Sequence, residues 1–285
     1  MCVRHNVPVI HVPTNPLSSH KPFVIRRIPG FATVAVICFA VLYIPLAPLV
    51  AYSFNAGTSI TLWEGFSLRW YEAAWRNDLV QEAAIRSVVI AVTASVCATT
   101  VATMAALGTT RTRPYRGQLA IYAIINQPLM VPEIVTAVAL LIVFAIVKTA
   151  TDYHGLAYLI VAHTAFCVPF AYLPIRARLE GMDLTLETAA ADLYATPWKI
   201  FHRVTLPLLL PGILAGAMLA FVISLDDVVI TEFVKSVGQD TLPTYMLGQL
   251  RRVVTPEINA ISTVLLGISV VLVTLVFLLS REKVQ

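Results

Sequence analysis

The sequence has few charged residues and no motif of a catalytic or nucleotide-binding site. Only 13% of its 285 residues are Asp, Glu, Lys or Arg, whereas 58% are hydrophobic, and the mean hydropathy is +0.79. A soluble domain carries about 25% charged residues, so this composition excludes a water-soluble globule and indicates an integral membrane protein. A G-x-x-x-x-G-K-[ST] loop, an H-E-x-x-H motif and a nucleophile elbow are all absent, so we expect no catalytic residue and no metal site.

Cysteine is also scarce. Of the four cysteines, Cys38, Cys97 and Cys167 lie within apolar segments, and no pair has the spacing of a metal or redox motif. This excludes a disulfide framework and leaves small packing residues. The histidines lie singly along the chain, which favours packing or interfacial positions over metal ligation.

Long uncharged runs are plentiful. A bilayer core about 30 Å thick needs roughly 20 apolar residues per helical crossing, and none of the runs shows the period-two alternation of barrel strands. The sequence therefore predicts an all-α polytopic membrane protein with six transmembrane helices. The predicted spans are Phe31–Ser53, Ile85–Leu107, Leu119–Val147, Leu156–Ile175, Leu208–Ile230 and Ala260–Ser280.

The third span contains two prolines near its start, Pro128 and Pro132. A proline removes a backbone donor and clashes with the carbonyl four residues earlier, so this part should be kinked or irregular. Glu133 follows directly. It fits equally well as a lining of a transport pathway and as a first-turn acid favoured by the helix dipole.

The distribution of Lys and Arg predicts the orientation. With a cytoplasmic N-terminus, the inside segments hold 13 of the 20 basic residues and the outside segments hold seven, so both termini are expected in the cytoplasm. The net charge of +4 then needs no nucleic-acid partner. We expect a cytoplasmic tail over residues 1–28, a transmembrane domain over 29–285, and a short interfacial helix in the aromatic-rich outer loop 54–84.

The inside loop over about 176–207 predicts two short helices. Asp183 can cap a helix through "LTLETAAADLY", and Thr196 with Pro197 can begin a second helix, "PWKIFHRV", expected to end before Leu206 and Pro207. Two short helices exposing small residues at a membrane face fit a docking surface, and they fit an ordinary amphipathic connector equally well.

This loop resembles the cytoplasmic signature of importer-type ABC transporter permeases, which is Glu-Ala-Ala, a glycine four residues on, and then an aliphatic residue and Leu-Pro. Ala189 and Ala190 match it, as does the spacing from residue 194 to Val204, Leu206 and Pro207. "LPLLLPGILAGAMLAFVISLDDVVITEFV", "TLPTYMLGQLRRVVTPEINAISTVLL" and "PLMVPEIV" resemble the spermidine/putrescine branch of that family, so that the likeness runs from about residue 30 to the end.

The resemblance implies the importer-type ABC permease fold and a subunit of an ATP-driven polyamine importer of the bacterial inner membrane. Its implied partners are a second permease in a heterodimer, a cytoplasmic ATPase dimer, a periplasmic polyamine-binding protein and membrane lipid. ATP and magnesium would bind to the ATPase, so no cofactor is expected in this chain.

Two positions depart from the family pattern. Thr188 stands where the family has glutamate, with Glu187 one position early, and Tyr194 stands where it has glycine. A glycine at a helix end supplies a left-handed backbone position that costs other residues about 1 kcal/mol and lets another surface approach closely. We expect a compensating cavity in the ATPase, and Glu187 can replace the missing acid after a small rotation.

Asp226 and Asp227 follow an uncharged run and lie roughly 10 Å beyond the centre of the fifth span, towards the outside. Charges in such segments usually face a bundle interior or water. Since adjacent helical residues point about 100° apart, one should line the cavity and the other should meet a neighbouring helix or a backbone donor. Two close carboxylates repel unless a cation is near, which points to a polycationic amine.

Glu232 and Glu257 can extend this acidic lining, and Tyr245 can offer an aromatic surface to an ammonium group. The alternative is structural: these acids cap helix ends or pair with Arg251 and Arg252. Other functions also stay open, namely an importer permease for another solute, a stand-alone cation channel, and a membrane-embedded enzyme using the aspartate pair.

Overall fold

The computed structural model describes residues 30–59, 62–112, 115–252 and 255–281. The predicted tail over residues 1–28 lies outside the described residues. In these ranges the regular structure is helical, and the one β-type pairing is an isolated bridge between Asn55 and Phe66. The chain forms two compact units, Met1–Ala47 and Pro48–Gln285, which are described separately.

The first unit contains α1 (Phe31–Tyr43), and the next helix, α2 (Leu46–Tyr52), begins at its end. Together the two helices are long and apolar enough for one broken span, in agreement with the predicted crossing Phe31–Ser53. Five further helices of the described residues pass the same test singly, so the structure carries five spans, or six with the bent pair.

Three helices form the core of the second unit: α4 (Asp78–Thr110), α7 (Ala157–Glu180) and α10 (Leu206–Asp226), packed pairwise on one another. Small side chains explain their close approach. Buried alanines recur every three or four residues of α4, from Ala91 to Ala106. On α10, a Cβ added to Gly216 would lie 2.7 Å from the carbonyl oxygen of Ala171 in α7.

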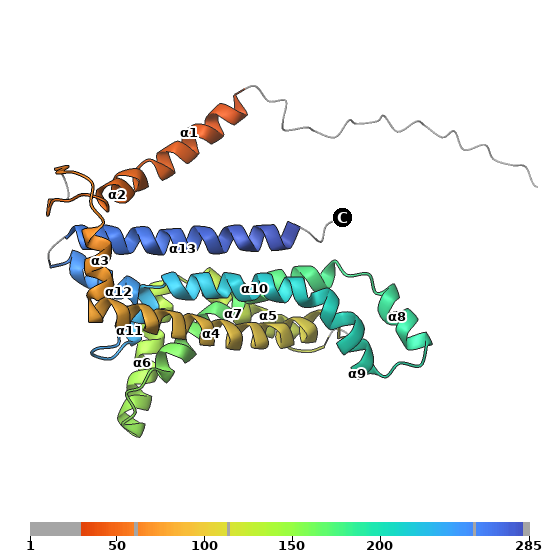
Figure 1. Cartoon of the computed structure of the whole chain (residues 1–285). Coiled ribbons are helices and arrows are strands. Elements are labelled where there is room, and N and C mark those ends of the chain that lie inside the picture. Colours follow the sequence, from red (N-terminus) through yellow and green to blue (C-terminus); the bar gives the residue numbers. More distant parts are fainter. Residues whose placement is uncertain (1–29, 60–61, 113–114, 253–254, 282–285) are drawn as a thin grey trace, which may run out of the picture. The chain divides into compact units, whose positions relative to one another are not determined.

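The third predicted crossing, Leu119–Val147, is wrong as a single helix. It consists of α5 (Gln118–Met130) and α6 (Glu133–Thr151), and only α6 is long enough for a span. The break falls at Val131 and Pro132, where extended backbone precedes α6, as the irregularity predicted from the prolines requires. In Figure 1, α6 runs at a steep angle to the core helices.

The fifth crossing also differs from its prediction. Its helix begins earlier, because α9 (Pro197–Ile200) continues through a π-helical turn (η2, Phe201–Thr205) directly into α10. The expectation that the second loop helix ends before Leu206 and Pro207 is therefore wrong: the wider π turn accommodates the proline without a break. At its other end the helix stops at Asp226, and α11 (Val229–Val234) is separate.

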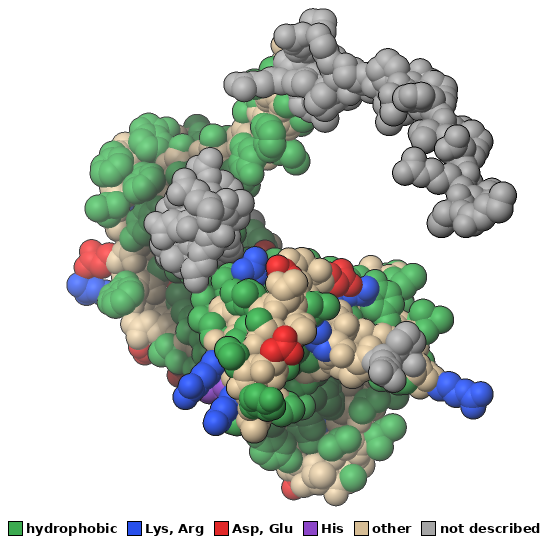
Figure 2. Space-filling view, turned by 90° about the vertical axis from the view of Figure 1, so that its right-hand side faces the viewer, with side chains coloured by type: hydrophobic (Ala, Val, Ile, Leu, Met, Phe, Trp, Pro, Cys, Tyr) green, Lys and Arg blue, Asp and Glu red, His purple; other side chains and the backbone are tan. Residues whose placement is uncertain are grey.

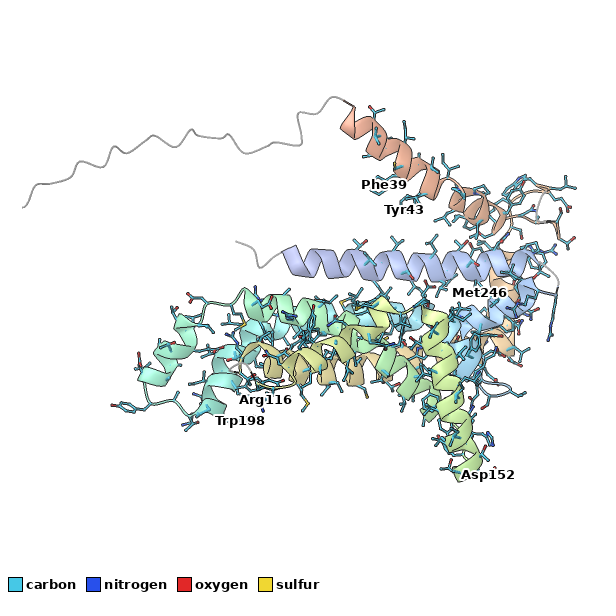
Figure 3. The ribbon with its side chains drawn as sticks, turned by 180° about the vertical axis from the view of Figure 1, so that it is seen from behind. Phe39, Tyr43, Arg116, Asp152, Trp198 and Met246 are labelled. Atoms are coloured by element: carbon cyan, nitrogen blue, oxygen red, sulfur yellow. The ribbon has the colours of Figure 1, made fainter. Side chains whose placement is uncertain are left out.

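The remaining helices lie at the two ends of the core (Figures 1 and 3). The loop helix α8 (Thr185–Asp192) and α9 lie at one end. At the other end are α3 (Arg69–Arg76), α11 and α12 (Leu242–Leu250), where α3 is the short helix predicted in the outer loop. The last helix, α13 (Pro256–Arg281), packs against α3 and α10.

Candidate functional site

The aspartate pair marks the end of α10. Asp226 is its last residue, and Asp227 adopts extended backbone (ψ 133°) before α11 begins. The carboxylate of Asp227 accepts hydrogen bonds from the backbone N–H groups of Ile230 (3.2 Å) and Thr231 (2.9 Å), and from the Thr231 hydroxyl (2.8 Å). Asp227 is thus buried and caps α11, which is the backbone-donor role expected for one member of the pair.

A buried histidine joins this break to α7. His163 Nδ1 lies 2.8 Å from Ser224 Oγ, its Nε2 lies 3.0 Å from Thr231 Oγ1, and Nε2 is 3.5 Å from Asp227 Oδ2. Because the Thr231 hydroxyl proton is used on Asp227, the network assigns the ring proton to Nε2 and makes Nδ1 an acceptor for Ser224. His163 is therefore a satisfied packing histidine, as expected.

Asp226 is exposed, whereas Asp227 is buried. Both line a pocket of about 360 Å³ together with Glu133 at the start of α6. The rest of the wall is mostly apolar and includes Phe166, Val222 and Ile223. The pocket thus places carboxylates from two elements, far apart in the sequence, around an apolar and aromatic surface. Glu133 begins α6, as one of its two readings has it, and also lines this pocket. Its part in a transport pathway stays a prediction.

The other residues predicted for the pathway lie apart from Asp226. Glu232 and Tyr245 line a different pocket of about 510 Å³, the α11–α12 pocket, at the end of the core where these two helices lie. There Glu232 accepts from Lys235 (2.6 Å) and is 3.9 Å from Arg251. Asn77 donates to the hydroxyl of Tyr245 (3.3 Å) and to Glu257 (3.0 Å). The residues of the expected acidic lining therefore lie in separate places. Arg251, near Glu232, is a partner that the alternative reading named, whereas Asn77, the partner of Glu257, is not.

The lining of the α11–α12 pocket includes a lysine with two acidic partners. Lys235 Nζ donates to Glu232 and to Asp240, both at 2.6 Å. Burial would lower the pKa of Lys235, but these two hydrogen bonds outweigh it and hold the pKa above its usual value. Arg86 of α4 donates to the carbonyl oxygen of Asp240 (2.7 Å), which pins the loop to the core.

At the opposite end, the loop helix α8 begins as predicted and ends in a left-handed residue. Asp183 accepts a hydrogen bond from the Thr185 N–H (2.9 Å), which holds the pKa of Asp183 below its usual value. Tyr194 has φ +59°. The N–H of Ala195 donates to Ala190, and the N–H of Tyr194 donates to Ala191, which is the Schellman pattern that favours glycine.

The surface around this helix end is apolar. Tyr194 is 97% exposed, and Leu193 and Trp198 are also exposed, with Trp198 stacked on His202. Figure 3 shows Trp198 and Arg116 at this end of the core, and Figure 2 shows charged side chains of both signs around the same face. The remaining family-motif positions lie here too: Ala189, Ala190, Val204, Leu206 and Pro207.

The polar side chains of the motif region, Thr188 and Glu187, both have hydrogen-bond partners within this chain. The hydroxyl of Thr188 donates to the carbonyl oxygen of Leu184 (3.0 Å). Glu187 Oε1 accepts from the hydroxyl of Thr205 (3.0 Å) and is 3.4 Å from Arg111 Nη2. Sequence reasoning missed the contact to Arg111, because 76 positions separate the residues and no local pattern joins them.

Comparisons with known proteins agree with this geometry. Residues 98–282 match the family described as "Binding-protein-dependent transport system inner membrane component". The chain is 38% identical over 244 residues to the putrescine transport system permease protein PotI of Escherichia coli (strain K12), covering 85% of this chain and 87% of that protein. It is 39% identical over 247 residues to the spermidine/putrescine transport system permease protein PotC of Haemophilus influenzae, covering 87% and 95%.

Two solved structures show the same fold. One is a bacterial ABC transporter involved in the import of the acidic polysaccharide alginate, with a TM-score of 0.68 and 15% identity over 90% of this chain and 96% of that chain. The other is the MetNI methionine ABC transporter, with a TM-score of 0.53 and 22% identity over 74% and 94%. The all-α permease fold expected from the sequence is confirmed.

Proposed function

The chain belongs to the family of binding-protein-dependent transport system inner membrane components, and on that premise we propose that it forms part of the membrane pathway for ATP-driven import of putrescine and spermidine. Relatives that carry these substrates in their names are 38% and 39% identical over most of the chain. Members of this family are transport subunits, and the chain has no phosphate-binding loop, so ATP hydrolysis belongs to a partner ATPase.

The observation that carries the proposal is the pocket between α6 and α10. Glu133 and Asp226 supply two carboxylates beside that of Asp227, which caps α11. Phe166, Val222 and Ile223 supply apolar surface. A polyamine carries ammonium groups separated by methylenes, so it needs separated negative charges with apolar or aromatic walls between them. A bound cation would also relieve the repulsion between neighbouring carboxylates.

The partners follow the importer arrangement. The chain would pair with a second permease, receive its substrate from a periplasmic polyamine-binding protein, and bind a cytoplasmic ATPase dimer at α8 and α9. A transporter of the same fold has been solved with a periplasmic protein bound to an alginate pentasaccharide, which supports a binding protein at the outer face. The excess of basic residues supports the inner-membrane orientation with both termini in the cytoplasm.

Uptake by charge-neutralised variants tests the pocket. In vesicles containing the whole transporter, we expect Asp226→Asn and Glu133→Gln each to lower labelled putrescine uptake at least about tenfold, since a hydrogen bond to a charged group contributes about 1.5–3 kcal/mol. Asp152→Asn is the matched control: it neutralises an acid at the far end of α6, in a left-handed position that Asn tolerates.

Unchanged uptake by both pocket variants, with normal assembly, contradicts the proposal. Two further measurements separate the alternatives. Mass spectrometry of the ligand carried by the binding protein would reveal an importer for another solute. Current through the purified chain without ATPase would reveal a stand-alone cation channel.

A further inference from the structure

The loop helix α8 has one polar side-chain link to the rest of the subunit within the described residues. Its other side-chain hydrogen bonds are local, from Thr188 to Leu184 and from the Thr185 N–H to Asp183. The link is the carboxylate of Glu187, whose Oε1 contacts both Arg111 and Thr205. This carboxylate oxygen is therefore the polar side-chain contact between α8 and the other elements of the described subunit.

The three residues belong to three different elements. Arg111 is the residue that ends α4, Glu187 lies in the first turn of α8, and Thr205 ends the π turn that continues directly into α10. Helix α10 then runs unbroken for 21 residues to Asp226, a length of about 30 Å. The contact thus joins α8 to two of the three core helices, one of which ends at the acidic pocket.

Arg111 and Glu187 form an ion pair without a hydrogen bond in this structure. The side chains of Arg111 and Glu187 are 20% and 24% exposed, so the pair is largely shielded from water. Arg111 Nε and Nη2 are buried and make no hydrogen bond, and the distance to Glu187 is 3.4 Å. A small movement of α8 towards α4 would convert this contact into a hydrogen-bonded pair, and a movement away would leave a buried guanidinium without its counter-charge.

We propose that Arg111, Glu187 and Thr205 form an internal strut that transmits displacement of α8 to α4 and α10, so that Glu187 acts within the permease and not as a contact to the ATPase. This inference rests on the proposed transport function. It makes the three residues positioning residues, because none of them touches the acidic pocket or substrate. It also assigns ATPase docking to the exposed apolar surface of Leu193, Tyr194 and Trp198.

The test uses the complete transporter in vesicles with its binding protein. Glu187→Gln is expected to retain the ATPase while the number of polyamines imported per ATP hydrolysed falls about fivefold or more, the lower end of typical coupling between sites. Thr205→Val should give a smaller loss of the same kind, because it leaves no buried charge unpaired. The reversed pair, Arg111→Glu with Glu187→Arg, should restore most of the ratio.

Glu180→Gln is the matched control, since Glu180 pairs with Arg176 within α7 alone (2.7 Å) and joins no second element. Loss of the ATPase from Glu187→Gln would overturn the proposal by making the acid a docking contact. Normal coupling in Glu187→Gln, or failure of the reversed pair to restore it in an assembled complex, would also overturn it.

A second measurement needs no substrate. In the purified transporter without substrate, Arg111→Gln and Glu187→Gln should lower Tm by less in combination than the sum of their separate effects. Additive effects would overturn the strut. If the wild-type transporter hydrolyses ATP without importing polyamine, the proposed function fails while this thermal cycle still decides the strut.

Discussion

Tyr194 occupies a backbone position that ordinarily selects glycine. Its φ of +59° is left-handed, and the two Schellman hydrogen bonds at the end of α8 require that conformation. A side chain in this region costs about 1 kcal/mol relative to glycine. The ring is 97% exposed, so that no packing within the described subunit offsets that cost. A stabilising contact of this ring would therefore come from a partner subunit.

Replacing Tyr194 with glycine distinguishes the cost of the strained backbone from a contact of the ring with the ATPase. Tyr194→Gly should raise the free energy of unfolding by about 1 kcal/mol by removing the strained side chain. With a compensating cavity in the ATPase, affinity measured by co-purification should rise or stay unchanged. Leu193→Ala, at an exposed position with ordinary backbone angles, serves as the comparison. A large loss of ATPase from Tyr194→Gly alone would show that the ring itself is the contact.

The acidic partners of Lys235 predict that the thermal stability of the protein falls at alkaline pH. Its hydrogen bonds to Asp240 and Glu232 raise its pKa against the opposing effect of burial. A group with a raised pKa stabilises the fold fully below its unfolded value, about 10.4, and that stability is lost as the pH rises through the higher folded value. Above about pH 10.4, Tm should therefore fall more steeply in the wild type than in Lys235→Gln.

Lys199 on α9 makes no ion pair among the described residues and provides the control. Lys199→Gln should follow the wild-type pH profile. Equal slopes for the wild type and Lys235→Gln would mean that the lysine contributes nothing to the closure of the loop.

At the scale of the elements, the core depends on small residues where helices cross. A Cβ at Gly216 would lie 2.7 Å from the Ala171 carbonyl oxygen and 3.3 Å from its Cα, and backbone cannot rotate away as a flexible side chain can. Gly212 faces α7 in the same way, but its near neighbour is the Cβ of Arg178. The close approach of α7 and α10 therefore depends on the absence of a side chain at these two positions.

The variant Gly216→Ala should lower the free energy of unfolding by about 1–3 kcal/mol, the usual range for overpacking. Gly267→Ala on α13 is the control, because no atom lies within 4 Å of the added Cβ and alanine favours a helix over glycine. Unfolding of both variants in the same detergent would be measured. Equal stability of the two would show that α7 separates from α10 at little cost.

At the scale of the whole molecule, the proposed docking surface at α8 and the acidic pocket lie at opposite ends of the core (Figures 1 and 3). Asp192 on α8 and Val237 between α11 and α12 are both exposed. In a chain whose native cysteines are replaced by serine, a membrane-impermeant thiol reagent should label Asp192→Cys only from the cytoplasm and Val237→Cys only from outside. Labelling of both from one side would contradict the orientation and the importer assignment with it.

Much of this arrangement was predictable from local pattern. The apolar runs indicated the spans, because a helix in lipid must satisfy its own backbone, and the prolines indicated the break before α6. The left-handed position of Tyr194 followed from the glycine that the family pattern has there. The boundaries at Leu206 and Asp226 were wrong, since a π turn and a side-chain cap, not hydrophobicity, decide where those helices begin and end.

The sequence by itself determined an apolar, multi-span helical chain with a two-helix loop and an acidic pair after its fifth apolar run, because these properties depend on residues close together in the chain. Only the tertiary structure decided that Glu133 shares a pocket with Asp226, that Asp227 caps α11, and that Glu187 meets Arg111. Those contacts join residues separated by up to 93 positions. They depend on how the helices pack against one another, and local sequence patterns do not determine that packing.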